Sequence, residues 1–201
     1  MRGLLLTAVL AAGAGGLTLA VPWRAVPAAP IPSERPPTRI AYAAGHRPVF
    51  ILPDGERREV FSLLNVPGRL RFGQYAWDEH GVPPGPTWVR VDLAHQLLSV
   101  FRAGHEIGTA VILYGADGRD TPIGVFPVLE KAREHRSAQY DAEMPYMLRL
   151  TRDGVAIHAS DVRAGVATHG CIGVPIDFAR LLFEHVQRRD PVAIFGPGTT
   201  A

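Results

Sequence analysis

The stretch Thr87–Tyr114, TWVRVDLAHQLLSVFRAGHEIGTAVILY, decides the fold class of this chain. Apolar and polar side chains alternate with a period of two in its opening residues, TWVRVDL, as they do in a strand with one buried face. A second apolar run, Leu97–Phe101, and a third run, Glu106–Tyr114, lie on either side of the turn-forming segment RAGH. Apolar runs joined by short Gly-containing turns are typical of an antiparallel meander. We therefore expect three consecutive strands in this stretch.

Most of the remaining folded chain is also predicted to be strand. The candidate strands are Gly124–Leu129, Tyr146–Leu150, Val155–His158 and Pro191–Phe195. One helix is predicted at Ile176–Arg188, where apolar residues recur at spacings of three and four. Pro175 stands just before its first turn, where proline is tolerated. Many strands, abundant Gly and Pro turns and a single helix predict a mainly β domain with the helix packed on it.

The N-terminus resembles a targeting segment. Residues 1–21 contain the uncharged run Leu4–Val21, rich in Leu and Ala, which fits either a cleaved signal peptide or a single N-terminal membrane anchor. Residues 22–39 are Pro-rich and are expected to form an extended linker. Both interpretations of residues 1–21 predict that the folded part is exported to the periplasm or cell envelope.

Residues 40–86 are expected to form an N-terminal part of the folded region. Within them, Val49–Val66, VFILPDGERREVFSLLNV, fits two arrangements. It is either a hairpin that turns at Asp54-Gly55 or a strand followed by a short helix.

Composition argues against a nucleic-acid partner. The 201 residues carry a formal net charge of +2. Lys and Arg form no dense tract, and pairs such as Arg57-Arg58 are interpreted as solvated surface. The hydrophobic content of 47% is enough for a sizeable core. We expect a monomer.

The only cysteine, Cys171, lies in the stretch ATHGCIGVP, residues 167–175. An intramolecular disulfide is therefore impossible, and an exported protein has reason to avoid an idle thiol. The position between turn-forming residues and the predicted helix would place Cys171 at the positive end of that helix. Such a setting favours the nucleophilic thiolate, so we expect a reactive cysteine with a lowered pKa.

A thiol nucleophile needs a base, and His158 is the best candidate. It closes a predicted strand thirteen residues before Cys171, a spacing that allows a loop to fold back. A Cys–His pair of this kind performs acyl chemistry. The backbone N–H groups of His169, Gly170 and Cys171 are candidate oxyanion donors, and Gly170 allows close approach of the backbone to substrate.

A zinc site is the rival interpretation of the same residues. His158, His169 and Cys171 match no common zinc spacing, and no second His or Cys cluster is present. We therefore expect neither a metal nor another cofactor.

The order of these motifs resembles the L,D-transpeptidase catalytic domain family, of the YkuD or ErfK/YbiS type. The resemblance is carried by IHAS at residues 157–160 and ATHGCIGVP at 167–175. Residues 121–126, TPIGVF, also resemble the family's Thr-Pro-x-Gly-x-Phe motif. The resemblance to the family extends over residues 87–197. It implies a β-sandwich with one helix after the catalytic cysteine loop.

The resemblance implies chemistry on peptidoglycan stem peptides. Cys171 would attack the carbonyl that joins the third residue, a diamino acid, to terminal D-Ala. D-Ala would leave, and an amine or water would resolve the thioester. In this resemblance His158 is the base, and the Ala159 carbonyl orients its ring. Thr168 and His169 would shape the loop. The alternatives are an L,D-carboxypeptidase and a catalytically weak peptidoglycan-binding module with the same fold.

The chain departs from the family pattern at Gly173, where many members carry Arg or Asn. His135, Arg149 and Arg163 are candidate replacements for that side chain. His135 and Tyr140 lie in a segment interpreted as a lid over the cysteine, and Tyr146 lies at the start of the next strand. His135, Tyr140, Tyr146 and Arg149 are the expected substrate contacts. Thr121 and Gly124 are interpreted as parts of a structural turn.

Overall fold

The computed structural model describes residues 39–116, 118–138 and 140–197. The predicted meander is present as β6 (Thr87–Asp92), β7 (Leu97–Arg102) and β8 (His105–Val111), which pair antiparallel in sequence order. The third strand ends earlier than expected because the backbone of Leu113 leaves β7 and pairs with Gly173. Residues 1–21 and 22–38, where we expect a signal or anchor and a linker, lie outside the described residues. Arg39 already belongs to the first strand.

The meander forms the centre of an eight-stranded sheet. Its order is β1-β4-β8-β7-β6-β14-β9, and β5 pairs with β8 beside this path. The further strands are β1 (Arg39–Ala41), β4 (Ser62–Leu64), β5 (Tyr75–Trp77), β9 (Gly124–Pro127) and β14 (Pro191–Phe195). Strands β1, β4 and β5 precede the meander in sequence and thus belong to the same sheet as the later strands.

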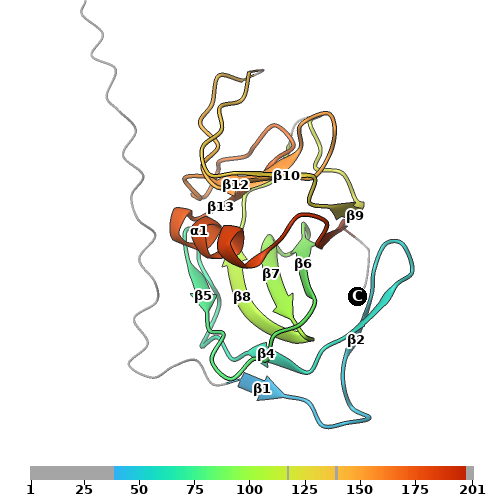
Figure 1. The fold of residues 1–201 in the computed structure, drawn as a ribbon. Helices are drawn as coiled ribbons and strands as arrows, with labels where there is room; N and C mark the ends of the chain where they lie inside the picture. The colour runs from blue at the N-terminus through green and yellow to red at the C-terminus, as the bar shows by residue number, and fades with distance from the viewer. Residues whose placement is uncertain (1–38, 117, 139, 198–201) are drawn as a thin grey trace, which may run out of the picture.

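A smaller sheet lies across from the main one. It contains β10 (Glu130–Ala132), β11 (Met147–Arg149), β12 (Ala156–Ala159) and β13 (Ile172–Val174). In Figure 1 β10, β12 and β13 lie above helix α1, and β6, β7 and β8 lie below it. Fully buried side chains from both sheets and α1 form one core, with Val91, Ile157 and Phe178 as examples. The predicted mainly β class with one helix is therefore confirmed.

The segment Val49–Val66 adopts the hairpin rather than the helix. Strands β2 (Val49–Ile51) and β3 (Arg57–Glu59) pair antiparallel, and Gly55 has a φ of +87°, which favours glycine in the turn. The hairpin covers a second apolar cluster on the outer face of the main sheet, in which Trp88 and Phe101 stack at 4.5 Å.

Helix α1 (Ile176–His185) is shorter than the predicted Ile176–Arg188. Val186 turns to an extended conformation (ψ 134°) and is itself fully buried, so the chain leaves the helix there. The Lys131 ammonium of β10 donates hydrogen bonds to the carbonyls of Phe183 and Val186. It thereby satisfies carbonyl groups that the helix end leaves without an internal partner.

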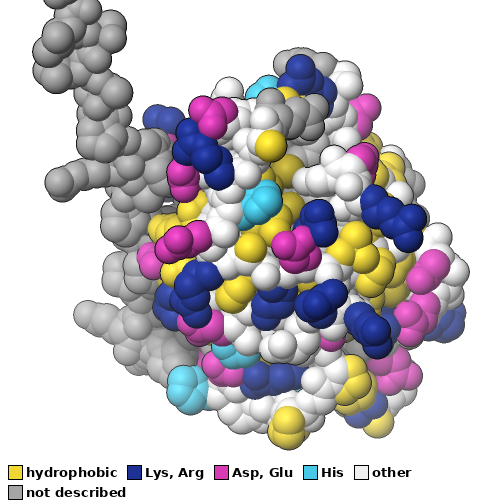
Figure 2. All heavy atoms as spheres, turned by 45° about the horizontal axis from the view of Figure 1, so that its top comes forward, with side chains coloured by type: hydrophobic (Ala, Val, Ile, Leu, Met, Phe, Trp, Pro, Cys, Tyr) yellow, Lys and Arg dark blue, Asp and Glu magenta, His cyan; other side chains and the backbone are white. Residues whose placement is uncertain are grey.

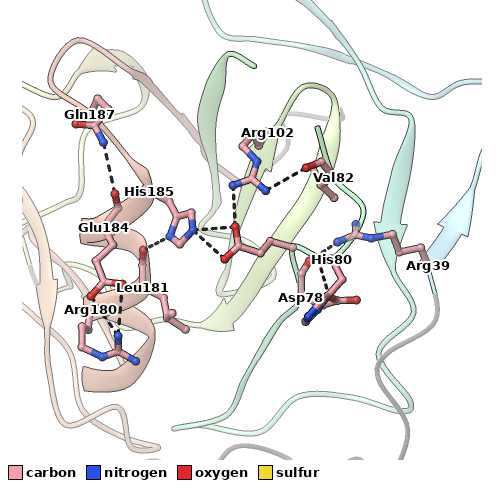
Figure 3. Close-up of polar contacts among 11 residues, drawn as sticks. Arg39, Asp78, His80, Val82, Arg102, Arg180, Leu181, Glu184, His185 and Gln187 are labelled. Carbon is pink, nitrogen blue, oxygen red and sulfur yellow. Dashed lines mark hydrogen bonds and ion pairs between the residues drawn. The ribbon is translucent and has the colours of Figure 1, made fainter. Parts of the chain in front are cut away.

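A polar network ties the end of α1 to the N-terminal part of the fold. The Glu79 carboxylate accepts hydrogen bonds from Arg102 at 2.8 Å and from His185 Nε2 at 3.0 Å. Figure 3 shows Arg102 of β7 and His185 of α1 both pointing toward the carboxylate that lies between them. Burial acts to raise the pKa of Glu79, but the hydrogen bonds and charges of Arg102 and His185 outweigh it and leave the pKa below its usual value. The network is therefore strongest when Glu79 is ionised.

Charges of both signs are interspersed on the surface. In Figure 2 basic and acidic side chains alternate over the face that is shown, with apolar side chains between them. Among the described residues, no helix is long and apolar enough to cross a membrane.

Candidate active site

The two best candidate residues line one cavity of about 770 Å³. Both Cys171 and His158 lie in its wall, together with parts of segments 119–120, 135–144, 152–155 and 168–170. Strand β12 carries His158 and pairs in parallel with β13, whose register places His158 opposite Gly173. Since Cys171 directly precedes β13, this pairing brings residues thirteen apart in sequence to one wall.

The cysteine loop, Thr168–Cys171, is held by the segment that extends β8. Leu113 and Gly173 exchange two backbone hydrogen bonds of 2.9 Å, and the Thr168 N–H donates to the Tyr114 carbonyl at 3.0 Å. The Thr168 hydroxyl donates to the carbonyl of Cys171. The loop is thus fixed at both ends by backbone contacts with residues 113–115.

Thr121 adds a buried link between the same two segments. Its hydroxyl accepts a hydrogen bond from the Gly115 N–H and donates one to the Gly170 carbonyl, both at 3.0 Å. Gly170 has a φ of +107°, and a Cβ on Gly115 would lie 2.8 Å from the Gly170 backbone. Glycine is therefore required at both positions. Thr121, interpreted from sequence as part of a structural turn, also holds the loop that carries Cys171.

The expectation of a lowered Cys171 pKa is wrong. Strand β13 separates Cys171 from α1, so the thiol does not lie at the helix N-terminus. Burial raises the pKa of the Cys171 thiol and outweighs the hydrogen bond from the Ala156 N–H. The thiol packs near Met144 and Met147 and donates a long hydrogen bond, 3.8 Å, to the Gly154 carbonyl. The resting group is a neutral thiol that needs a base.

His158 is held in the tautomer that a base requires. Its Nδ1 lies 2.8 Å from the Ala159 carbonyl, which can only accept, so Nδ1 carries the proton. In the neutral ring Nε2 is then free to accept a proton. Burial lowers the pKa of His158, and His135 acts in the same direction, against the effect of the Ala159 hydrogen bond. The imidazole therefore remains neutral at lower pH than a free histidine.

The candidate oxyanion donors lie in the cavity wall. His169, Gly170 and Cys171 all line it. None of their backbone N–H groups donates to an acceptor within residues 39–116, 118–138 and 140–197. Unpaired N–H groups beside a nucleophile are suited to binding a developing oxyanion.

Gly173 has a packing role that the sequence did not reveal. It is buried in β13, and a Cβ there would lie 2.7 Å from Ser160 Oγ and 3.4 Å from Leu113 Cβ. Ser160 Oγ in turn lies 3.4 Å from His158 Nδ1. The glycine thus leaves room for Ser160 beside the His158 ring.

Arg136 and Glu143 form an antiparallel bridge in the segment that follows β10, and ion pairs also join the two sides of this segment. Arg136 bonds Asp141 at 2.6 Å and Glu143 at 2.7 Å. The Tyr140 ring stacks on His169 of the cysteine loop, with centroids 4.6 Å apart and planes within 9°. This segment therefore contacts the loop that carries Cys171. Both His135 and Tyr140 line the cavity.

The structure places the other expected contacts outside the cavity lining. Tyr146 packs edge-on against Phe183 of α1. The Arg149 guanidinium pairs with Glu130 across β10 and β11. Arg163 pairs with Asp161 at 2.7 Å and is exposed. Each of these arginines thus has a carboxylate partner away from the cavity lining.

Sequence reasoning missed three residues near the reacting groups. Arg119 and Arg152 line the cavity, and Ser160 adjoins the base. Only Arg119 could have been suspected from the sequence, because it lies two residues before the TPIGVF motif. In the described part of the chain, no three His, Cys, Asp or Glu side chains form a group that could hold a metal ion.

Comparisons with known proteins point to one family. The family model for the L,D-transpeptidase catalytic domain, YkuD, matches residues 86–194. No curated protein matches the chain. Among solved structures, an L,D-transpeptidase from Stackebrandtia nassauensis is 28% identical with a TM-score of 0.53, over 58% of this chain and 60% of that one. The Enterococcus faecium L,D-transpeptidase C442S mutant is 26% identical with a TM-score of 0.51, over 56% and 50%.

The match thus spans less than two thirds of the length of these solved structures. The family model nevertheless covers more than half of this chain and includes both Cys171 and His158. This chain belongs to the L,D-transpeptidase catalytic domain family.

Proposed function

We propose that this protein is an L,D-transpeptidase that transfers acyl groups between peptidoglycan stem peptides, with Cys171 as nucleophile and His158 as base. The observation that carries the proposal is the shared cavity wall, in which a neutral thiol lies near an imidazole whose Nδ1 is fixed by the Ala159 carbonyl. That arrangement is suited to acyl transfer through a thioester.

In the first half-reaction the Cys171 sulfur attacks the carbonyl between the third residue and terminal D-Ala. The thiol proton passes to Nε2 of His158 as the carbon–sulfur bond forms. The negative oxygen of the tetrahedral intermediate accepts hydrogen bonds from N–H groups of the loop His169–Cys171. The carbon–nitrogen bond then breaks, and His158 returns the proton to the amine of departing D-Ala.

In the second half-reaction an amine from another stem peptide attacks the thioester. His158 takes a proton from this amine, the carbon–sulfur bond breaks, and the thiolate regains a proton. Water in place of the amine would give L,D-carboxypeptidase activity with the same residues. A substrate in the cell wall requires export of the domain, and the apolar run Leu4–Val21 is the feature of the sequence that supports it.

The test uses the full chain and a disaccharide-tetrapeptide donor, followed by mass spectrometry. We expect a covalent adduct on Cys171 with loss of D-Ala, and a cross-linked product when an amine acceptor is added. Cys171→Ala is the matched control and should form neither. Hydrolysed tripeptide without cross-links would instead identify a carboxypeptidase. A folded protein that binds peptidoglycan but forms no adduct, with this donor or with a carbapenem, would contradict the enzymatic proposal.

A further inference from the structure

A second cavity, of about 850 Å³, shares no lining residue with the cavity of the candidate active site. It lies between the loop of residues 64–72, which follows β4, and the strands β7 and β8. Ser99 and Thr109 line it and pair with each other across these strands, where they alternate with the core residues Leu98 and Ala110. The cavity is therefore on the face of the main sheet that points away from the core. Its volume falls within the range of ligand pockets, roughly 300–1,000 Å³.

The loop over this cavity carries two arginines and an exposed aromatic ring. Arg69, Arg71 and Phe72 all line the cavity and are exposed. Neither guanidinium pairs with a carboxylate among the residues that the structure describes, whereas Arg102 of β7 does. Residues 65–73, NVPGRLRFG, contain no acidic side chain, and we call this segment the arginine loop. Two arginines without an internal anion are suited to bind an anionic group.

Hydrogen bonds fix the turn that presents these side chains. The Arg71 N–H donates to Oε1 of Gln74, and the Gln74 N–H donates to the Arg71 carbonyl, both at 2.9 Å. The Val111 N–H of β8 donates to the Gln74 carbonyl at 3.2 Å, which ties the turn to the sheet. Leu70 packs against the apolar cluster that contains Val111. The backbone of the arginine loop is thus held in place before a ligand binds, which lowers the cost of ordering it.

The other ionisable side chains of the cavity, Glu106 and His95, are engaged within the fold. Glu106 is 6% exposed, and its Oε2 accepts a hydrogen bond from the Leu64 N–H at 2.9 Å. Burial raises the pKa of Glu106, which favours its uncharged form. Nδ1 of His95 lies 2.9 Å from the Asp92 carboxylate. The exposed charge of the cavity is therefore that of the two arginines.

The segment that the sequence predicts to meet a membrane joins the fold beside this loop. Arg39 is the first described residue, and the register of β1 with β4 places it opposite Leu64, where the cavity wall begins. Residues 22–38, the predicted linker, therefore enter the fold next to the arginine loop. At about 3.1 Å per residue, an extended linker of this length reaches at most about 50 Å. An anchor formed by residues 1–21 would keep the loop within that distance of the lipid headgroups.

We propose that the arginine loop and the cavity behind it dock this domain onto a membrane surface that contains anionic phospholipid. Arg69 and Arg71 bind the headgroup phosphate, because arginine matches the geometry of phosphate with paired hydrogen bonds. Phe72 enters the interface, where aromatic side chains are favoured, and the apolar wall of the cavity receives part of the lipid. This docking is a second role of the domain and does not depend on the acyl transfer proposed above.

The test uses the full chain reconstituted in vesicles, with hydrogen exchange of the arginine loop measured by mass spectrometry. Vesicles of phosphatidylcholine alone are compared with vesicles that also contain phosphatidylglycerol. We expect the amides of residues 69–73 to be protected from exchange only when phosphatidylglycerol is present. Raising the ionic strength from about 0.1 M to about 1 M shortens the screening length from about 10 Å to about 3 Å, and it should remove this protection.

Substitutions in the loop test the individual contacts. Arg69→Gln and Arg71→Gln should each lower the protection about fivefold, the usual effect of one basic residue near an anionic surface, and the double variant should abolish it. Phe72→Ser should weaken the protection without changing its dependence on ionic strength. Arg57→Gln is the matched control, because Arg57 is an exposed arginine of β3 outside the cavity lining, and it should retain full protection.

Alkylation of Cys171 by iodoacetamide should be equal in all of these variants, which shows that the fold is intact. Equal exchange in the two kinds of vesicle, or protection that survives in the double arginine variant, would overturn the proposal. Equal protection by soluble glycerol phosphate would assign the cavity to a free phosphate compound and would likewise overturn docking to a membrane.

Discussion

His158 and His185 have the same contact at one ring nitrogen and different contacts at the other. In both residues Nδ1 lies 2.8 Å from a backbone carbonyl, of Ala159 and Leu181 respectively. Nε2 of His185 bonds the Glu79 carboxylate, whereas His158 lines the cavity. Both nitrogens of His185 therefore face acceptors within the protein, and neither is free to take a proton from a substrate. A backbone carbonyl thus orients both imidazoles, and only the ring of His158 keeps a nitrogen available for the role of base that we propose.

The largest expected effect comes from replacing His158 by glutamine, and the same replacement at His185 is the control. His158→Gln should lower the acylation rate by about 10²–10⁴-fold, the usual contribution of a general base. His185→Gln should leave that rate within about twofold, because surface-type ion pairs far from the reacting atoms contribute little. Stopped-flow or quenched-flow acylation with the tetrapeptide donor measures both. Equal losses of acylation rate in the two variants would show that His158 has no role that His185 lacks.

The next effect tests the packing around the His158 ring. Gly173→Ala should destabilise the fold by about 1–3 kcal/mol, the usual cost of overpacking, and should slow acylation by displacing Ser160. Urea unfolding and the acylation rate measure these changes. Ser160→Gly in the same chain removes the atoms that the new Cβ would meet, so the double variant should recover much of the stability. If Gly173→Ala is neutral in both measurements, then Gly173 does not make room for Ser160.

The smallest effects concern pH, and they appear in different measurements at the two histidine sites. The pKa of His158 is lowered from 6.5, so the acylation rate should rise with pH through an apparent pKa below 6.5. The thiol titrates above its ordinary 9.0, so alkylation by iodoacetamide should increase only in that alkaline range. Rapid alkylation at acidic pH would show instead that a thiolate is already present.

At the His185 site the pH effect appears in stability. The folded pKa of Glu79 is below its usual 4.5, so the contribution of Glu79 to stability is complete above that value and is lost as pH falls through the folded pKa. The wild type should therefore lose more stability than Glu79→Gln when the pH is lowered from about 6 to about 3. Urea unfolding at the two pH values measures the difference. Identical losses would show that the ion pair contributes nothing in this range.

The sequence was sufficient for the local elements and for the family. Alternation in Thr87–Asp92 predicted β6, and three- and four-residue spacing predicted α1, because both patterns report the periodicity of a buried face. The ordered motifs around His158 and Cys171 predicted the family that the comparisons then showed. The end of α1 was predicted three residues too late because the burial of Val186 depends on the rest of the core.

The ionisation of Cys171, the role of Gly173 and the polar lining of the cavity were decided by tertiary structure alone. The sequence placed Cys171 close to a helix start, but strand β13, which pairs in parallel with β12, separates the two, and the thiol is partly buried. The Thr121 hydroxyl reaches the cysteine loop from 49 residues away in the chain, through its hydrogen bond to the Gly170 carbonyl. Periodicity and spacing determine which side chains can share a face. Strand register and loop packing determine which of them finally lie together, because those depend on contacts between distant segments.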